Sequence, residues 1–283
     1  MLKAPAIQRN KPISINSNWS MEILPSNFPL LPKIPDFVNE IYITMIPGGN
    51  WNDTVNIAQK VQNNGKQAIP HIAARSLKGI EELEKCLSGL NESKIQKVLL
   101  IGGGQNKPEG NFSCVMDMLK TGLFTKYGIN EIDYAGHPEG NPDDPFSETN
   151  LVDKLNWSKE QSIQSRIITQ WCFDTDTANR WINDLREKGI RNPIHIGIPG
   201  PSTLKTLMRF AKVCGVKAST SVLRKQGLNL SKLMFVNKPD NIVSQLQGYE
   251  QLHLYPFGGI EKSSEWLTDW ENSGNKIRNI NYL

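Results

Sequence analysis

The sequence predicts a single (β/α)8 TIM barrel, and three observations predict it. The chain has 283 residues, close to the roughly 250 that such a barrel uses. Strand-like apolar runs alternate with helix-like periodic segments along the chain, which is the order of an α/β fold. No shift in composition divides the chain. We therefore expect one barrel domain over residues 1–283, with an extended N-terminal segment at 1–14.

Eight short segments rich in β-branched and aromatic residues predict the strands. In chain order they are SNWSMEIL, EIYITMI, KQAIPHI, IQKVLLIG, EIDYAG, RIITQWCF, PIHIGI and QLHLYP.

Segments with apolar residues at every third or fourth position predict helices between these strands. They cover residues 52–64, 79–90, 112–121, 147–164, 176–188, 202–213 and 239–248, and EKSSEWLTDWENS supplies a helix after the last strand. Side chains of the capping type and glycines mark the helix ends. The expected N-caps are Asn52, Thr177 and Ser202, and the expected stops are Gly65, Gly122, Gly189 and Gly215.

A doubly wound sheet is the main rival fold, and its nucleotide-binding motifs are not found. Read from Gly102, the stretch IGGGQNKP places Lys107 where the last glycine of G-x-G-x-x-G belongs. The GK pair at 65–66 is followed by Gln67, so the phosphate-binding Walker loop also fails. The barrel is the better prediction.

Composition narrows the class of protein further. The formal net charge is +4 without a dense Lys/Arg block, which disfavours nucleic-acid binding but suits a small anionic ligand. Apolar runs are too short for a membrane span, and the first residues lack the apolar core of a secretion signal. Four scattered cysteines form no CxxC pair, so we expect buried free thiols in a reducing, cytoplasmic compartment.

Polar side chains follow several predicted strands, at the end where barrel active sites lie. Three of the four histidines lie in or at the ends of strands, whereas His195 lies mid-strand. The positions that strand ends define are Glu22, Thr44, His71, the glycines 102–104, His137, Glu139, Gln170 and Tyr255. We therefore expect a candidate site there, although any strand-end histidine can also be structural.

Glu22 is the most informative of these residues, because it interrupts the apolar run WSMEILPS. Burial disfavours the charged form of a carboxyl, so we expect a raised pKa and a general acid. The alternative is a Glu paired with a buried Lys or Arg. Gln170 ends another apolar strand, and its amide suits either the edge of a heterocycle or a structural cap.

The HPEG stretch offers the strongest hint of a metal site. His137 and Glu139 are two residues apart with Pro138 between them, so their side chains diverge. Because no second pair of ligands accompanies them, we predict no catalytic metal.

Five strand-end motifs, in the correct order, resemble the methylenetetrahydrofolate reductase family. They are SMEILPS, PHIAARS, AGHPEG, ITQWCFD and GIPGPSTLK. The resemblance implies a barrel that moves a hydride between NAD(P)H and the one-carbon unit of methylenetetrahydrofolate through FAD. It also implies a homo-oligomer.

The resemblance assigns roles by position. Glu22 matches the proton donor, Gln170 matches the pterin-binding glutamine, and Thr203 and Leu204 fall in the folate-contacting loop. The positions matching flavin contacts are Thr44, His71, Gly102, Gly103, Gly104, Ala135, Gly136, His137 and Lys159. We expect the AGHPEG loop to wrap the cofactor, with Gly136 allowing close backbone approach.

Four departures from the family pattern leave alternatives open. The glycines 102–104 replace an R-G-D sequence, His137 replaces a tyrosine, Ser158 replaces the arginine of an Arg-Lys pair, and Leu204 replaces a phenylalanine. Backbone N–H groups of a triple glycine can still bind a phosphate. The alternatives are a flavin-independent reductase, a non-catalytic folate- or flavin-binding partner of a one-carbon enzyme, and a metal-dependent hydrolase. The physiological direction of the reaction also stays open.

Overall fold

The computed structural model describes residues 19–46, 48–214 and 236–273, and they form a closed barrel of eight parallel strands. The strand order is β1-β10-β7-β6-β5-β4-β3-β2, which confirms the predicted (β/α)8 class. The barrel strands are β1 (Trp19–Ile23), β2 (Glu40–Ile43), β3 (Gln67–Ala73), β4 (Lys97–Ile101), β5 (Glu131–Gly136), β6 (Gln164–Thr169), β7 (Ile194–Pro199) and β10 (Gln251–Tyr255).

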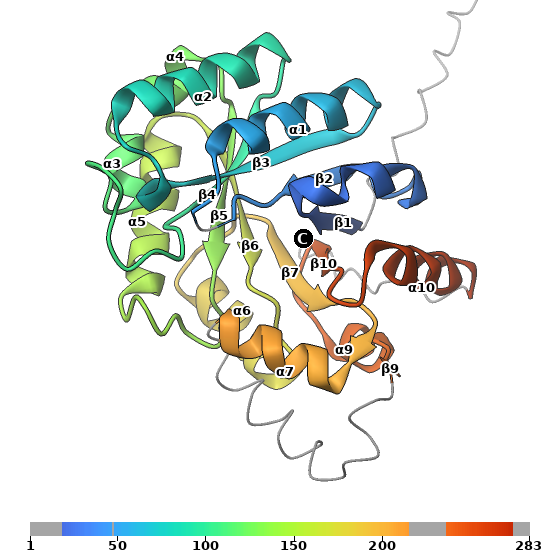
Figure 1. Cartoon of the computed structure of the whole chain (residues 1–283). Coiled ribbons are helices and arrows are strands. Elements are labelled where there is room, and N and C mark those ends of the chain that lie inside the picture. The colour runs from blue at the N-terminus through green and yellow to red at the C-terminus, as the bar shows by residue number, and fades with distance from the viewer. Residues whose placement is uncertain (1–18, 47, 215–235, 274–283) are drawn as a thin grey trace, which may run out of the picture.

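Helices surround the strands, as Figure 1 shows. They are α1 (Trp51–Asn63), α2 (Ile80–Glu92), α3 (Val115–Leu119), α4 (Leu123–Lys126), α5 (Ser147–Glu160), α6 (Thr175–Glu187), α7 (Leu204–Val213), α9 (Asp240–Gln245) and α10 (Ile260–Asn272). Two 3-10 helices, η1 (Pro25–Lys33) and η2 (Ala74–Ser76), follow β1 and β3. A small antiparallel pair, β8 (Ser202–Thr203) and β9 (Val236–Asn237), lies outside the barrel.

Helix ends differ in detail from the predicted ones. The side chains of Asn50, Asp174 and Thr203 cap α1, α6 and α7, one to three residues away from the expected caps. The predicted helix at 112–121 is instead the short pair α3 and α4. Gly65 and Gly189 follow α1 and α6 with positive φ, as stops do. Gly122 also has positive φ but precedes α4. Gly215 and the segment 1–14 lie outside the described residues.

The main core lies between the strands and the helices. Along β1, Trp19, Met21 and Ile23 are fully buried and belong to this core. Because side chains alternate along a strand, the residues between them point into the barrel. Burying each large apolar side chain contributes about 1.5–3 kcal/mol, so the outer layer stabilises the fold and the interior can carry polar groups.

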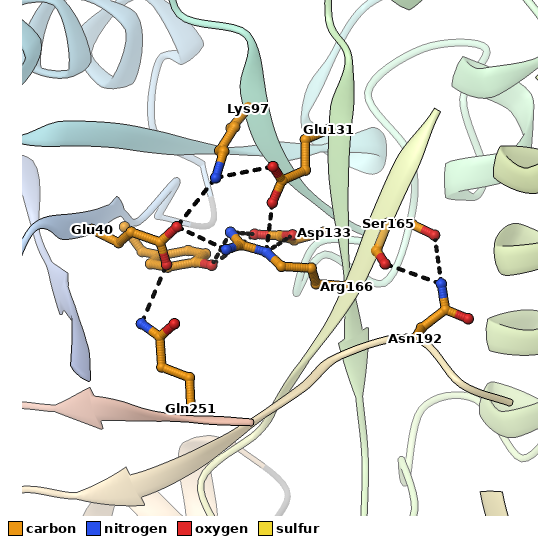
Figure 2. A network of polar contacts seen from close by, with 9 residues as sticks. Glu40, Lys97, Glu131, Asp133, Ser165, Arg166, Asn192 and Gln251 are labelled. Carbon is orange, nitrogen blue, oxygen red and sulfur yellow. Dashed lines mark hydrogen bonds and ion pairs between the residues drawn. The ribbon is translucent and has the colours of Figure 1, made fainter. Parts of the chain in front are cut away.

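The N-terminal end of the barrel interior holds a buried ionic network. Figure 2 shows three carboxylates gathered around the guanidinium of Arg166 on β6. They belong to Glu40 on β2 and to Glu131 and Asp133 on β5, and the contacts measure 2.7, 2.7 and 2.8 Å. Lys97 on β4 bridges Glu40 and Glu131 at 3.3 and 2.9 Å. We call these five residues the floor network.

Tyr42 joins the floor network to the middle of the barrel. Its hydroxyl donates to Asp133 Oδ2 at 2.7 Å and accepts from Arg166 Nη2 at 3.0 Å. Although burial alone would raise the pKa of Glu40, the charges of Arg166, His195 and Lys97 lower it to about 2. The network therefore keeps the Glu40 carboxylate ionised inside the barrel.

The cysteines agree only in part with the expectation of buried thiols. All four are free; Cys86 and Cys172 are buried, Cys214 is half-buried and Cys114 is exposed. Cys114 is exposed because it stands in the loop just before α3 rather than inside a helix. Among the described residues, no helix combines the length and the apolar character that crossing a membrane requires.

Candidate functional site

Glu22 lies inside the barrel at the C-terminal end of β1. Its neighbours Met21 and Ile23 point outward into the core, so alternation along the strand turns the carboxyl inward. Thr44, directly after β2, donates from its hydroxyl to Glu22 Oε1 at 3.0 Å. The Glu22 side chain is 17% exposed. Glu22 therefore interrupts an apolar run because its neighbours face the core while its own side chain faces the barrel mouth.

Two imidazoles face the other carboxyl oxygen. His71 Nε2 on β3 and His253 Nε2 on β10 lie 3.7 and 3.6 Å from Glu22 Oε2. Both nitrogens are buried and have no hydrogen-bond partner. Ser20 Oγ lies 2.9 Å from Nδ1 of His253 and fixes that ring. Glu22, Thr44, His71 and His253 form what we call the mouth cluster.

The expectation of a raised pKa at Glu22 is wrong. Burial alone would raise it, but the contact with His253, the charges of His71 and His253, and the Thr44 hydrogen bond together lower the pKa below its ordinary value. The sequence shows the apolar neighbours of Glu22 but not the imidazoles that the barrel brings to it. No Lys or Arg forms an ion pair with this carboxyl in the described part of the chain.

Replacing His253 by glutamine is expected to raise the pKa of Glu22. The variant removes the contact and the electrostatic effect of His253, which lower the pKa of Glu22, while burial remains, so the protonated carboxyl persists to higher pH. Infrared difference spectra during a pH titration detect this form, and Glu22→Gln identifies its band. His195→Gln is the control, because His195 is an equally buried histidine outside the mouth cluster. An unchanged Glu22 titration in His253→Gln contradicts the arrangement.

Gln170 lies beside a very small cavity. Its side-chain Oε1 accepts from the backbone N–H of Trp171 at 3.0 Å, and its backbone N–H donates to the Gly136 carbonyl at 2.8 Å. The cavity, about 10 Å³, is lined by His137, Pro138, Glu139, Gly140, Gln170, Trp171 and Cys214. The structure thus brings Gln170 and His137 to one pocket. The Glu139 carboxylate, which also lines the cavity, accepts a hydrogen bond from the thiol of Cys172 at 3.1 Å.

Thr203 and Leu204 begin α7 near this pocket. Thr203 is the helix N-cap, accepting from the Thr206 N–H at 3.2 Å. Leu204 is buried in a small apolar cluster with Trp171 and Leu207. Tyr255 packs against that cluster and donates to the Thr169 carbonyl at 3.0 Å. The apolar side chains of Trp171, Leu204 and Leu207 therefore lie next to the mouth cluster, which they reach through the contact of Tyr255 with His253.

The expected cofactor positions fall into separate groups. Thr44 and His71 contact Glu22 itself. Ala135 belongs to the inward-facing register of β5, but Gly136 faces outward. A Cβ at Gly136 would lie 2.7 Å from the Trp181 ring and 2.8 Å from the Ile167 side chain. Gly136 is therefore required because a side chain there would collide with Trp181 of α6 and with Ile167. From the sequence we expected a glycine at this position for close approach to a cofactor, and the structure gives this different reason.

Lys159 is not brought to the mouth. It is exposed in the last turn of α5, and α5 carries the chain back to the N-terminal end of β6. Lys154, one helix turn and more before it, lies 5.6 Å from the Tyr134 ring centroid. Burial lowers the pKa of Lys154 to about 8, and burial together with Lys154 lowers the pKa of His137 to about 4. Sequence reasoning missed Lys154.

Gly102, Gly103 and Gly104 follow β4 at the same end of the barrel. Their neighbour is Arg75, whose backbone N–H donates to the Gly102 carbonyl at 3.0 Å and whose guanidinium donates to the Gly103 carbonyl. The stretch PHIAARS already contained this arginine four residues after His71. Its role could not be read from spacing, because the contact joins two strands.

A larger cavity of about 400 Å³ opens at the opposite, N-terminal end of the strands. Its lining includes Gln67, Lys97, Glu131 and Gln164, at the starts of β3 to β6. Barrel chemistry is carried by the C-terminal end, so we assign the candidate site to the mouth cluster. Over the described ranges, no group of three or more His, Cys, Asp or Glu side chains is arranged to hold a metal ion.

Fold and site together define a (β/α)8 barrel with a carboxyl–imidazole cluster at its mouth, and comparisons with known proteins identify the family. Residues 30–232 match the family model for methylenetetrahydrofolate reductase. The chain belongs to the methylenetetrahydrofolate reductase family.

Named relatives agree with this membership. Methylenetetrahydrofolate reductase (NADH) 1 of Arabidopsis thaliana is 32% identical over 199 residues, covering 62% of this chain and 32% of that protein. The probable methylenetetrahydrofolate reductase (NADH) of Oryza sativa subsp. japonica is 30% identical over 247 residues, covering 78% and 41%. The chain thus spans less than half the length of these curated relatives.

A solved structure shows the same fold. It is an uncharacterized protein from Clostridium thermocellum described as binding two copies of 5-methyl-5,6,7,8-tetrahydrofolic acid. The TM-score is 0.57 at 11% identity, with 90% of this chain and 95% of that chain covered.

Proposed function

We propose that this chain is a folate oxidoreductase that interconverts 5,10-methylenetetrahydrofolate and 5-methyltetrahydrofolate with NAD(P)H. The observation that carries the proposal is the place of Glu22. In a chain of this family, an inward carboxyl at the barrel mouth is held by Thr44, His71 and His253. The Clostridium thermocellum protein is consistent with a folate ligand for this fold.

In the proposed reduction, Glu22 donates a proton to N10 of the folate. The C–N10 bond of the five-membered ring then breaks and leaves an iminium carbon. A hydride originating from the reduced nicotinamide adds to that carbon, which yields the methyl group and oxidised nicotinamide. Gln170 would orient the pterin, with Thr203 and Leu204 contacting the folate beside it.

Because the pKa of Glu22 lies below its ordinary value in the unliganded protein, we expect Glu22 to take up its proton when the substrate binds. In the unliganded protein the pKa of Glu22 and the pKa of His71 both lie below their ordinary values. When the folate ring covers the mouth, water leaves and the charged carboxyl becomes less favourable. The cluster then holds its proton on Glu22, beside the folate nitrogen. The rate of hydride transfer is expected to fall as pH rises.

We also propose FAD as the cofactor at the same mouth. The buried, unpartnered Nε of Arg75 and Oγ of Ser76, beside the glycines 102–104, fit a phosphate group. Thr44, His71, Ala135 and His137 would lie toward the flavin ring. When bound, FAD supplies a reversible hydride carrier. A yellow purified protein that releases flavin on denaturation supports this cofactor, whereas a colourless active protein favours direct transfer from the nicotinamide.

The test of the function is turnover by purified protein. Mixing it with methylenetetrahydrofolate and NADH or NADPH should oxidise the nicotinamide and produce methyltetrahydrofolate. The reverse direction should be assayed with methyltetrahydrofolate and oxidised nicotinamide. Folate binding without turnover in either direction rejects the enzyme and favours a non-catalytic folate-binding partner.

We further propose a cytoplasmic homo-oligomer that needs neither nucleic acid nor a membrane. The free state of the four cysteines supports the reducing compartment. Size-exclusion chromatography with light scattering tests the oligomer, and a monomer contradicts it.

A further inference from the structure

We propose that Tyr42 is a positioning residue of the candidate site, and that its ring holds the two imidazoles of the mouth cluster against Glu22. Tyr42 belongs neither to the mouth cluster nor to the floor network, yet it contacts both. The inference rests on the proposed function in one respect, because that function gives Glu22 its role as proton donor. The placement of the rings is a property of the unliganded protein, so it can be tested without turnover.

Three layers of inward-facing side chains fill the barrel. Along β2 and just beyond it, Glu40, Tyr42 and Thr44 belong to the floor network, to a middle layer and to the mouth cluster, in that order. On β6 the same spacing places Arg166 in the floor network and Ile168 in the middle layer. The middle layer is a cluster of four buried residues, Tyr42, Ile69, Leu99 and Ile168. Of these four, only Tyr42 has a polar side-chain atom and can hydrogen-bond to the floor network.

The hydroxyl of Tyr42 is held from two sides. It accepts from Arg166 Nη2 at 3.0 Å. Because a guanidinium has no acceptor, the hydroxyl gives its own proton to Asp133 Oδ2 at 2.7 Å. Asp133 is itself fixed by Nε and Nη2 of Arg166, both at 2.8 Å (Figure 2). The fully buried Tyr42 is therefore anchored at its hydroxyl end by a rigid ion pair.

The ring of Tyr42 contacts both imidazoles of the mouth cluster. Its centroid lies 4.6 Å from that of His253, with the ring planes at 73°, and 6.3 Å from that of His71, at 71°. These edge-to-face arrangements are the ones that aromatic rings favour. Tyr42 is also the partner of Glu22 where β1 pairs with β2, so both side chains lie on the inner face. The ring thus forms the inner boundary of the mouth cluster.

Hydrogen bonds hold the two imidazoles only in part. Each Nε2 is buried without a hydrogen-bond partner, and its distance of 3.6 or 3.7 Å from Glu22 Oε2 exceeds the ordinary length of such a bond. Ser20 contacts Nδ1 of His253. Tyr42 is the ring contact that both imidazoles share, so it sets their distance from the carboxyl together.

Charge also links the floor network to the mouth. Burial lowers the pKa of His71, whereas the charges of Glu22 and Asp133 act to raise it. Asp133 is the carboxylate that the Tyr42 hydroxyl binds. The residue that packs against His71 therefore also fixes a charge that acts on it.

Removing the ring should weaken the contacts that lower the pKa of Glu22. Those contacts come from the imidazoles, and burial remains, so the carboxyl keeps its proton to higher pH. The charge of Glu22 also acts on Tyr255 and Cys214, but burial and that charge raise the pKa of both groups. They stay neutral near neutral pH and do not replace the imidazoles.

The experiment follows the titration of Glu22 in the unliganded full chain by infrared difference spectra, with Glu22→Gln identifying the band. Tyr42→Leu removes the ring and should move this titration to higher pH. Tyr42→Phe keeps the ring without its anchor and should give a smaller shift in the same direction. The chain has four histidines, so histidine-labelled protein gives few ring signals in NMR spectra. Those of His71 and His253 should move, while that of His137 should stay.

Tyr134 provides matched controls. It is also a fully buried tyrosine, and its hydroxyl lies 2.7 Å from Ser158 Oγ, but it belongs to the outer core. Tyr134→Phe and Tyr134→Leu should leave the titration of Glu22 at the wild-type position. Equal shifts in the Tyr134 and Tyr42 variants, or a wild-type titration in folded Tyr42→Leu, overturn the inference. If Tyr42→Leu does not fold, a wild-type titration in Tyr42→Phe overturns it.

Single-turnover rates separate this inference from the proposed function. A carboxyl with a higher pKa is a weaker acid, so hydride transfer at low pH should fall by roughly threefold or more in Tyr42→Leu. Folate affinity should stay near the wild-type value, because Tyr42 is fully buried beneath the mouth. A shifted Glu22 titration without folate turnover in wild type leaves Tyr42 as a positioning residue and rejects the proposed function. Normal turnover with wild-type titrations in both Tyr42 variants does the reverse.

Discussion

Replacing Glu22 by glutamine should lower the rate of hydride transfer to methylenetetrahydrofolate by roughly 10²–10⁴-fold, the usual contribution of a general acid. The amide has the shape of the carboxyl and can still accept from the Thr44 hydroxyl. It cannot deliver an acidic proton to the folate nitrogen. Single-turnover mixing with NADH measures the step directly.

Two controls accompany the Glu22→Gln rate measurement: the folate affinity of the same variant and the rate of a matched surface variant. Folate affinity in Glu22→Gln should stay near the wild-type value, because the pocket keeps its shape. Glu261→Gln makes the same change at an exposed position of α10 and should leave the rate unchanged. A Glu22→Gln protein that transfers hydride at the wild-type rate removes the general acid from the account.

Replacing Arg166 by leucine should destabilise the fold by about 3–5 kcal/mol, the cost of breaking a buried ion pair from one side. The Arg166 side chain is 12% exposed, and its guanidinium contacts three carboxylates. Without it, Lys97 still pairs with Glu40 and Glu131, but the fully buried Asp133 loses the cation that it binds. Urea unfolding followed by circular dichroism measures the loss.

Two further variants separate charge from packing. Asp133→Asn added to Arg166→Leu should recover part of the stability, because it removes one uncompensated charge. Lys126→Met breaks the exposed Lys126–Glu84 pair and should change stability little. Equal losses in Lys126→Met and Arg166→Leu contradict the role given to the floor network.

The network also predicts the direction of acid sensitivity. The pKa of Glu40 falls from the ordinary 4.5 to about 2 in the folded protein. Its contribution to stability is therefore complete above the ordinary value and is lost as pH falls through that interval. Unfolding free energies measured between pH 6 and pH 2 (roughly the carboxylate range) should decline, and less steeply in Arg166→Leu.

Alternation of strands and helices made the barrel predictable, because it is a local property of the chain. Each strand needed only a short apolar run, and each helix only an amphipathic period. The strand-end rule then placed Glu22, Thr44 and His71 on one face. Helix caps were less predictable, since Asn50 and Asn52 are both good capping residues and only geometry distinguishes them.

Properties that depend on residues distant in sequence were not predictable. Burial and the contacts with His253, His71 and Thr44 together determine the pKa of Glu22, and His253 is more than two hundred residues away in the sequence. Arg166 meets Glu40 across 126 positions, and Arg75 meets Gly103 across strands. Each contact joins residues from different strands or the loops that follow them, so no local sequence pattern predicts it. Lys159 shows that a positional match to a family motif can also mislead. It matches a flavin contact in sequence, but it lies exposed in the last turn of α5 and not at the barrel mouth.

The most direct measurement follows the hydride itself into the folate. Stoichiometric protein is mixed with methylenetetrahydrofolate and NADH, and 5-methyltetrahydrofolate is quantified by mass spectrometry against NADH oxidised. The account predicts one methyl product for each NADH consumed by the wild-type chain, and almost none over the same time with Glu22→Gln. NADH oxidation without methyl product, or equal product from both proteins, would contradict it.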